Sequence, residues 1–296
     1  MPSGEVVGEI NGKLAEELGL PKGILLVSGG HDQCCAALGA GVIKEKIAVD
    51  SHGTAEVLST AFHRPLLNDI MYISYYPCYC YTMKDMYFTF SLNHTGGLLL
   101  QWYRDNLGYK EVLAAEKLAV SPYQLMIDKA PAGPSPVLIL PHFNGSGTPW
   151  CDFESKGAIL GLTISTTRHD IVKGILDSLA YELRVNIERM KAAGIEISEL
   201  RAAGGAAKSP VWLQIKADVT GCVVATLKIK EAACLGAAML AGTGTGVYKS
   251  LAEAAGRLVS IESVYEPNER ISQLYNEKYD IYKEIYDTLR VINRKL

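Results

Sequence analysis

The clearest hydrophobic pattern in the chain lies between residues 168 and 193. Apolar side chains recur there at spacings of three and four, which places them on one face of a helix. Thr167 and Asp170 form a capping pair before this run and Gly194 follows it, so the pattern predicts a helix that packs on a sheet or another helix. The apolar positions are Val172, Leu176, Leu179, Leu183, Ile187 and Met190.

Five further segments have helical patterns. Residues 34–40 and 231–242 are rich in small side chains, and residues 97–106 end before Gly108. Ser209 and Pro210 predict the start of a helix that closes at Gly221. The last helix is expected over 268–292, with an apolar stripe of Ile271, Leu274, Ile281, Ile285 and Leu289.

Strand patterns alternate with these helices. Residues 24–27 and 137–140 are short apolar runs, and 47–60 predicts a hairpin that turns at His52 and Gly53. Residues 70–90 are rich in tyrosine, phenylalanine and threonine, which favours two more strands. This alternation predicts layered α/β or α+β architecture.

Composition narrows the class of protein. A chain of 296 residues with 48% hydrophobic residues can bury a substantial core, and a net charge of -3 gives no reason to expect nucleic acid or a membrane as partner. The chain shows no secretory signal and no long apolar run, so we expect a cytoplasmic protein. Its seven cysteines include no C-x-x-C pair and its six histidines no ligand spacing, so no metal site is predicted.

The stretch VSGGHDQCCAALGAG, residues 27–41, places an acid between a strand and a helix. Asp32 can serve there as a helix N-cap. It can also serve as a functional carboxylate, because α/β proteins bind ligands at the carboxyl ends of strands. The stretch alone leaves both interpretations open.

Three glycine-containing turns are candidates for phosphate binding. Gly53 and Thr54 offer backbone amides and a hydroxyl, although a plain hairpin turn has the same sequence. Gly204 and Gly205 precede a helix start, which suits a nucleotide phosphate or simply close packing. The run GTGTG at 242–246 follows a helix and opens none, so we interpret it as a helix stop.

Taken in order, these stretches resemble the FGGY family of carbohydrate kinases, from about Gly4 to beyond Gly246. The blocks that carry the resemblance are GGHDQCCAALGAG, DSHGTAEVL, HTGGLLLQWYRD, GAILGLTISTTRHDIVKGILDSLAYE, AAGGAAKSPVWLQIKAD and EAACLGAAMLAG. The combination is specific, although no single block is. The resemblance implies an actin-like, ribonuclease H-like ATPase fold, in which a mixed sheet is flanked by helices.

The resemblance also implies roles for individual residues. Asp32 is similar to the family's general base and Gln33 to a residue that hydrogen-bonds the sugar. The nucleotide residues implied are Gly53 and Thr54 at the terminal phosphates, Gly97 and Gln101 along the site, Gly204 and Gly205 at the adenosine, and Ser209 by the adenine. ATP and Mg²⁺ are the implied cofactors. One carboxylate at the hydroxyl and backbone donors at the phosphates suit phosphoryl transfer, which depends mostly on positioning.

Departures from the family pattern concern the substrate and the domain organisation. The loop before Trp150 lacks the Glu-Arg pair of some relatives, so a xylulose-type substrate does not follow. We expect residues 1–43 to be the end of the family's N-terminal domain and residues 44–296 to form its C-terminal domain. The helix within 36–41 would then pack on the sheet of that first domain, which carries the metal-holding acid and most sugar contacts.

The resulting hypothesis is an ATP-dependent sugar or polyol kinase, inactive without the N-terminal kinase domain as partner, and with a homodimer possible. A non-catalytic nucleotide-binding or interaction module is the alternative. A metal-dependent hydrolase that uses His31, Asp32 and other histidines is a second alternative.

Overall fold

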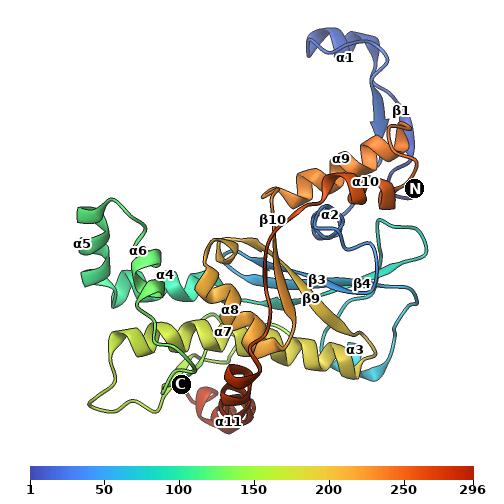
Figure 1. Ribbon diagram of the computed structural model, residues 1–296. Coiled ribbons are helices and arrows are strands. Elements are labelled where there is room, and N and C mark those ends of the chain that lie inside the picture. The colour runs from blue at the N-terminus through green and yellow to red at the C-terminus, as the bar shows by residue number, and fades with distance from the viewer.

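A seven-stranded mixed sheet forms the centre of the protein in a computed structural model that describes residues 1–296 (Figure 1). Its strand order is β11-β10-β9-β3-β4-β6-β5, and β3, β9 and β10 run parallel to one another. The other pairings are antiparallel. The bounds are β3 (Lys46–His52), β4 (Glu56–Phe62), β5 (Tyr79–Cys80), β6 (Tyr87–Asn93), β9 (Ile197–Gly204), β10 (Val223–Leu227) and β11 (Ile261–Tyr265).

One face of the sheet is covered by α7 (Arg168–Ala192) and α8 (Pro210–Thr220), which share a buried cluster with β3, β4, β9 and β10. The capping box predicted for α7 is present, because Thr167 and Asp170 each bond the other's backbone. Ser209 caps α8 and Gly221 ends it with a φ of 70°, as the sequence predicts. These two helices therefore have sharply defined ends.

The opposite face is covered by α2 (Asp32–Gly39), α9 (Ala232–Gly244) and α10 (Leu251–Leu258), which lie above the sheet in Figure 1. Two glycines let α2 and α9 touch backbone to backbone. A Cβ on Gly39 would lie 1.8 Å from the carbonyl oxygen of Ala232, and one on Gly236 would lie 1.9 Å from that of Cys35. The small residues of both helices therefore allow α2 and α9 to cross in close contact.

The contact between α2 and α9 corrects one sequence interpretation. The packing partner of the small-residue helix lies within this chain, so its composition does not require the sheet of another domain. The boundary near residue 43 stays a prediction. The helix stop at GTGTG is confirmed, since α9 ends at Gly244.

The C-terminal helix α11 (Glu269–Asn293) lies outside α7, but its predicted stripe is wrong in part. Leu274 and Ile281 are exposed, and the buried face is formed by tyrosines, Ile285 and Asn293. Each tyrosine hydroxyl has a partner, so the rings are buried without an unsatisfied polar atom. The pairs are Tyr275 with Lys173 and Asp177, Tyr279 with Glu188, Tyr282 with Glu182, and Tyr286 with Asp152.

A third group of elements lies at one end of α7. It consists of α4 (Gly97–Asn106), α5 (Tyr109–Leu118), α6 (Pro122–Asp128) and the two-stranded pair β7 (Leu138–Leu140) with β8 (Ala158–Leu160). The helix at 97–106 and the strand near 137–140 are confirmed. Gly174 lets Val137 and Ile139 pack closely against α7, since a Cβ on this residue would lie 2.9 Å from the Val137 side chain.

Residues 70–73 are helical, where the sequence pattern predicts strand. Its tyrosine and isoleucine content favours β structure, yet Asn68 accepts a hydrogen bond from the amide of Met71 and starts α3 (Asp69–Ile73). Local capping therefore outweighs β propensity here.

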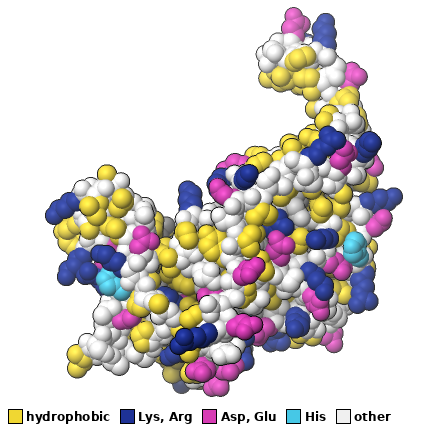
Figure 2. All heavy atoms as spheres, viewed as in Figure 1, with side chains coloured by type: hydrophobic (Ala, Val, Ile, Leu, Met, Phe, Trp, Pro, Cys, Tyr) yellow, Lys and Arg dark blue, Asp and Glu magenta, His cyan; other side chains and the backbone are white.

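The N-terminal segment projects from the body as β1 (Val6–Glu9), α1 (Gly12–Glu17) and β2 (Leu25–Val27) (Figure 1). Figure 2 shows apolar side chains on this projection, and Val7, Leu14, Leu18 and Leu26 are exposed. No helix of the protein combines the length and apolar character needed to cross a membrane.

Candidate functional site

A cavity of about 680 Å³ lies where three glycine-containing segments meet. They are the turn between β3 and β4, the start of α4, and the loop between β9 and α8. Six of the predicted nucleotide residues line this one cavity, although they come from segments far apart in the sequence. They are Gly53, Thr54, Gly97, Gln101, Gly205 and Ser209.

The turn between β3 and β4 is held by the first amides of α4. The Gly53 carbonyl accepts from the Gly97 amide at 2.8 Å, and the Thr54 carbonyl accepts from the Gly96 amide at 2.8 Å. Gly97 is required for this approach, since a Cβ there would lie 2.8 Å from the Gly53 oxygen. The amides of Thr54 and Ala55 donate to no group of the protein, and Thr54 lines the cavity, so its amide is available to an anion there.

The loop after β9 is bonded to the same turn. Gly204 has a φ of 81°, and a Cβ on it would lie 2.4 Å from the carbonyl oxygen of His52. That oxygen accepts from the amide of Gly205 at 2.8 Å. Gly204 therefore packs behind the cavity, whereas Gly205 lines it. The close-packing interpretation is therefore confirmed for Gly204, and phosphate binding at Gly205 stays a prediction.

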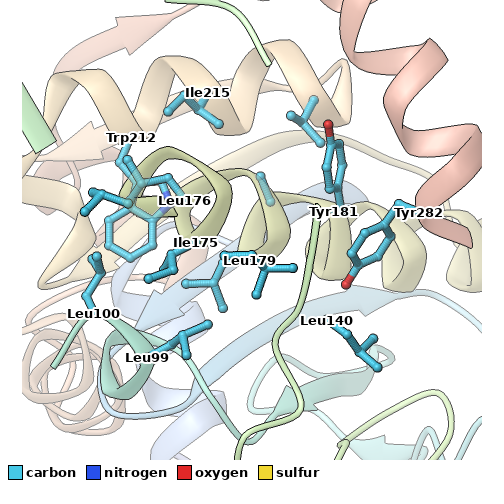
Figure 3. Packing of buried hydrophobic residues seen from close by; sticks show 14 of the residues in the cluster. Leu99, Leu100, Leu140, Ile175, Leu176, Leu179, Tyr181, Trp212, Ile215 and Tyr282 are labelled. Atoms are coloured by element: carbon cyan, nitrogen blue, oxygen red, sulfur yellow. The ribbon is translucent and has the colours of Figure 1, made fainter. Parts of the chain in front are cut away.

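Ser209 occupies the N-cap of α8 at the edge of the cavity. Its hydroxyl oxygen accepts from the amide of Trp212 at 3.3 Å. Trp212 is buried, and its ring lies beside Leu100 and Leu176 in Figure 3. The tryptophan thus connects the cavity wall to the hydrophobic core.

Several lining residues were missed by the sequence analysis. Tyr123 and Gln124 come from α6, which has no clear apolar period, and Lys208 precedes the predicted cap. Lys208 could have been found as the one cation beside Gly204, Gly205 and Ser209. Nothing in the spacing of the α6 residues marks them as part of this site.

Asp32 and Gln33 lie outside the lining of this cavity. The N-cap of α2 is His31 rather than Asp32, and the His31 Nδ1 accepts from the Gln33 amide at 3.3 Å. Asp32 is the first helical residue, and its side chain is 77% exposed. The ring of His31 stacks on Tyr79 at 6.4 Å. The Asp32 carboxylate is therefore open to solvent, and it also accepts from the Gln33 amide at 2.7 Å.

A buried charged cluster lies directly beneath the turn of residues 53–55. Donor atoms of Asp50, His52 and Glu56 all lie within 4.8 Å of one another, as metal ligands do. The ammonium of Lys216 bonds Asp50, and it bonds Glu56 at 2.6 Å, so a lysine already supplies the positive charge. These residues therefore do not fit a metal ion.

The ionisation of these groups reflects their burial. Burial raises the pKa of Asp50 to about 6, although Lys216 opposes the shift. Burial also opposes ionisation of Glu56, but Lys216 and His52 outweigh it and hold the Glu56 pKa well below its usual range. For Lys216, the two carboxylates outweigh burial and raise the pKa. The lysine is therefore charged at neutral pH.

Residues 51–245 match the FGGY family of carbohydrate kinases, C-terminal domain. Xylulose kinase of Staphylococcus epidermidis is 30% identical over 294 residues, which cover 98% of this chain and 56% of that protein. Autoinducer-2 kinase of Salmonella typhimurium is 28% identical over 98% of this chain and 55% of its own length.

Solved structures agree in fold. The ligand-bound xylulose kinase from Lactobacillus acidophilus superposes with a TM-score of 0.87 at 21% identity, over 100% of this chain and 58% of its own. Plasmodium falciparum glycerol kinase with ADP gives a TM-score of 0.80 at 21% identity, over 96% of this chain and 55% of its own.

The fold is the actin-like ATPase fold, with a mixed sheet flanked by helices. The chain belongs to the FGGY family of carbohydrate kinases. It spans a little over half the length of the relatives it matches. Family membership favours the kinase hypothesis over the metal-dependent hydrolase.

Proposed function

We propose that this chain provides the nucleotide-binding side of an ATP-dependent kinase, which phosphorylates a hydroxyl of a sugar or polyol in the cytoplasm. The observation that carries the proposal is the convergence of three glycine-containing segments on one cavity. The carbonyls of Gly53 and Thr54 accept from amides at the start of α4, whereas the amide of Thr54 is left free at the cavity, which is an arrangement suited to phosphate oxygens.

The nucleotide is assigned to this cavity. Gly53 and Thr54 would meet the terminal phosphates, and Gly97 and Gln101 would line the middle of the site. The adenosine would lie by the loop of Gly204 and Gly205, with the adenine near Ser209. Lys208 lines the same cavity and adds a positive charge for an anionic ligand.

Asp32 is assigned as the general base and Gln33 as a hydrogen-bond partner of the sugar. A carboxylate within hydrogen-bond reach of the acceptor hydroxyl would take its proton as the oxygen attacks the terminal phosphoryl group. The exposure of the Asp32 side chain supports this role, since it leaves the carboxylate accessible.

Catalysis is expected to need the part of the relatives that this chain does not span. We propose that this part, the family's N-terminal kinase domain, holds Mg²⁺ through an acid, makes most contacts to the sugar and closes over the nucleotide. Closure aligns the hydroxyl, metal and phosphate and excludes water. The exposed apolar side chains of the projecting segment supply a surface that such a partner domain could cover.

The test is ADP release across a panel of pentoses, hexoses, ketoses and polyols, with and without an added N-terminal domain of a relative. We expect no useful turnover by the 296 residues alone, turnover with the added domain, and loss of that turnover in Asp32→Asn. Undiminished turnover by the reconstituted Asp32→Asn enzyme would remove Asp32 from the role of base.

A further inference from the structure

Lys216 lies at the centre of the charged cluster and is fully buried. Its Nζ bonds the carboxylates of Asp50 and Glu56 and lies 3.2 Å from the Nδ1 of His52. The same His52 nitrogen lies 2.8 Å from the Glu56 Oε1. One ammonium group thus joins three side chains; we call these four residues the Lys216 cluster.

The cluster brackets the turn assigned to the phosphates. Asp50 and His52 end β3, and Glu56 begins β4, so all three lie within four residues of Gly53 or Thr54. Lys216 comes from α8, the helix that Ser209 caps at the same cavity. The lysine therefore connects the two segments assigned to opposite ends of the nucleotide.

Stability does not account for this arrangement. Burying ions costs several kcal/mol each, and well-packed apolar side chains of similar volume often serve a core equally well. Two carboxylates beneath an anion-binding turn would in addition repel phosphate, because Coulomb energies are large in a buried environment. The ammonium of Lys216 bonds both carboxylates from within α8 and offsets part of their negative charge.

We propose that Lys216 is a positioning residue for the nucleotide phosphates. By bonding both Asp50 and Glu56 and offsetting part of their negative charge, it holds the turn of residues 53–55 in its anion-binding shape and fixes that turn to α8. The inference rests on the proposed nucleotide-binding function and concerns the phosphates rather than the adenosine.

The experiment compares binding of ADP and AMP by ligand titration followed by NMR. The wild-type chain should prefer ADP, and Lys216→Met should lose about tenfold in ADP affinity while its AMP affinity changes less than about twofold. Lys173→Met is the matched control, because Lys173 is also a buried lysine paired with a carboxylate, Asp177, but bonds no residue beside the turn of residues 53–55. It should lower thermal stability and leave the preference for ADP intact.

Every other outcome overturns the inference about Lys216 or the proposed function. Two results would show that Lys216 has a merely structural role. One is an equal loss of ADP and AMP affinity in folded Lys216→Met. The other is that Lys173→Met loses the preference for ADP as well. If Lys216→Met does not fold, Glu56→Gln replaces it, and an unchanged ADP preference in that variant overturns the inference. A wild-type chain that binds both nucleotides equally also overturns it, whereas one that binds neither contradicts the proposed function itself.

Discussion

The amide of Gly205 donates a 2.8 Å hydrogen bond to the carbonyl oxygen of His52, which joins the loop after β9 to the turn after β3. Gly204 makes this contact possible, because any side chain there would collide with the same oxygen. Two segments separated by about 150 residues thereby form one wall of the cavity. The wall of this cavity therefore depends on a backbone contact that no polar side chain mediates.

We predict that Gly204→Ala lowers ADP affinity by about tenfold, because the added methyl pushes the two loops apart. Gly221→Ala is the matched control. Gly221 also has a positive φ, of 70°, but a Cβ there meets nothing within 4 Å. Both variants should lose about 1 kcal/mol of unfolding free energy to backbone strain, and only Gly204→Ala should lose nucleotide affinity. Equal ADP affinity in the two variants would contradict the assignment.

The crossing of α2 and α9 predicts a large stability effect. Gly236→Ala places a methyl group 1.9 Å from the Cys35 carbonyl oxygen, and we expect a loss of about 3 kcal/mol in unfolding free energy. Gly256→Ala in α10 is the control. It meets nothing within 4 Å, so it should gain up to about 1 kcal/mol through helix propensity. Urea unfolding of the two variants measures the difference, and similar midpoints would disprove the tight crossing.

The Lys216 cluster predicts a pH-dependent difference between the wild type and Asp50→Asn. Burial raises the pKa of Asp50 from 3.8 to about 6, so the folded state binds this proton more tightly than the unfolded state does. The resulting stabilisation is complete below pH 3.8 and is lost as the pH rises through about 6. Relative to Asp50→Asn, the wild type should therefore be more stable at pH 4 than at pH 7, by about 2 kcal/mol. A difference that stays constant between these pH values would contradict the burial of an ionised Asp50.

Hydrogen exchange should separate the N-terminal projection from α2. The pairing of β1 with β2 forms a two-stranded hairpin with few buried side chains, which is marginally stable in isolation. We predict rapid exchange over residues 5–27 and protection of α2 similar to that of α7, because α2 packs on α9. Rapid exchange that continues to residue 43 would instead place the domain boundary there.

The sequence predicted the elements whose ends carry local signals. The capping box of α7, the Ser209 and Pro210 start of α8 and the hairpin of β3 and β4 each depend on residues close together in the chain. The buried tyrosines of α11 were not predictable in the same way. Their burial requires hydroxyl partners on α7 and in the loop that contains Asp152, which only the tertiary structure supplies.

The same distinction holds for the site. The glycine turns were recognised because close backbone approach favours glycine, whatever the ligand. The Lys216 cluster was missed, since Lys216 lies 160 residues from Glu56 and follows no local pattern. The sequence therefore predicted the segments that form the cavity. It did not predict the charged side chains of the Lys216 cluster, which lie next to the turn of residues 53–55.

Calorimetric titration of the 296-residue chain with ADP tests the central claim most directly. These 296 residues line the cavity from one side, and we expect a whole kinase to enclose the nucleotide from a second domain as well, so the affinity of this chain should be well below that of a whole kinase. We predict one saturable site per chain with a dissociation constant of about 0.1–1 mM, and competition by ATP. The absence of saturable binding of ADP and ATP at about 10 mM would contradict the assignment of this cavity to the nucleotide.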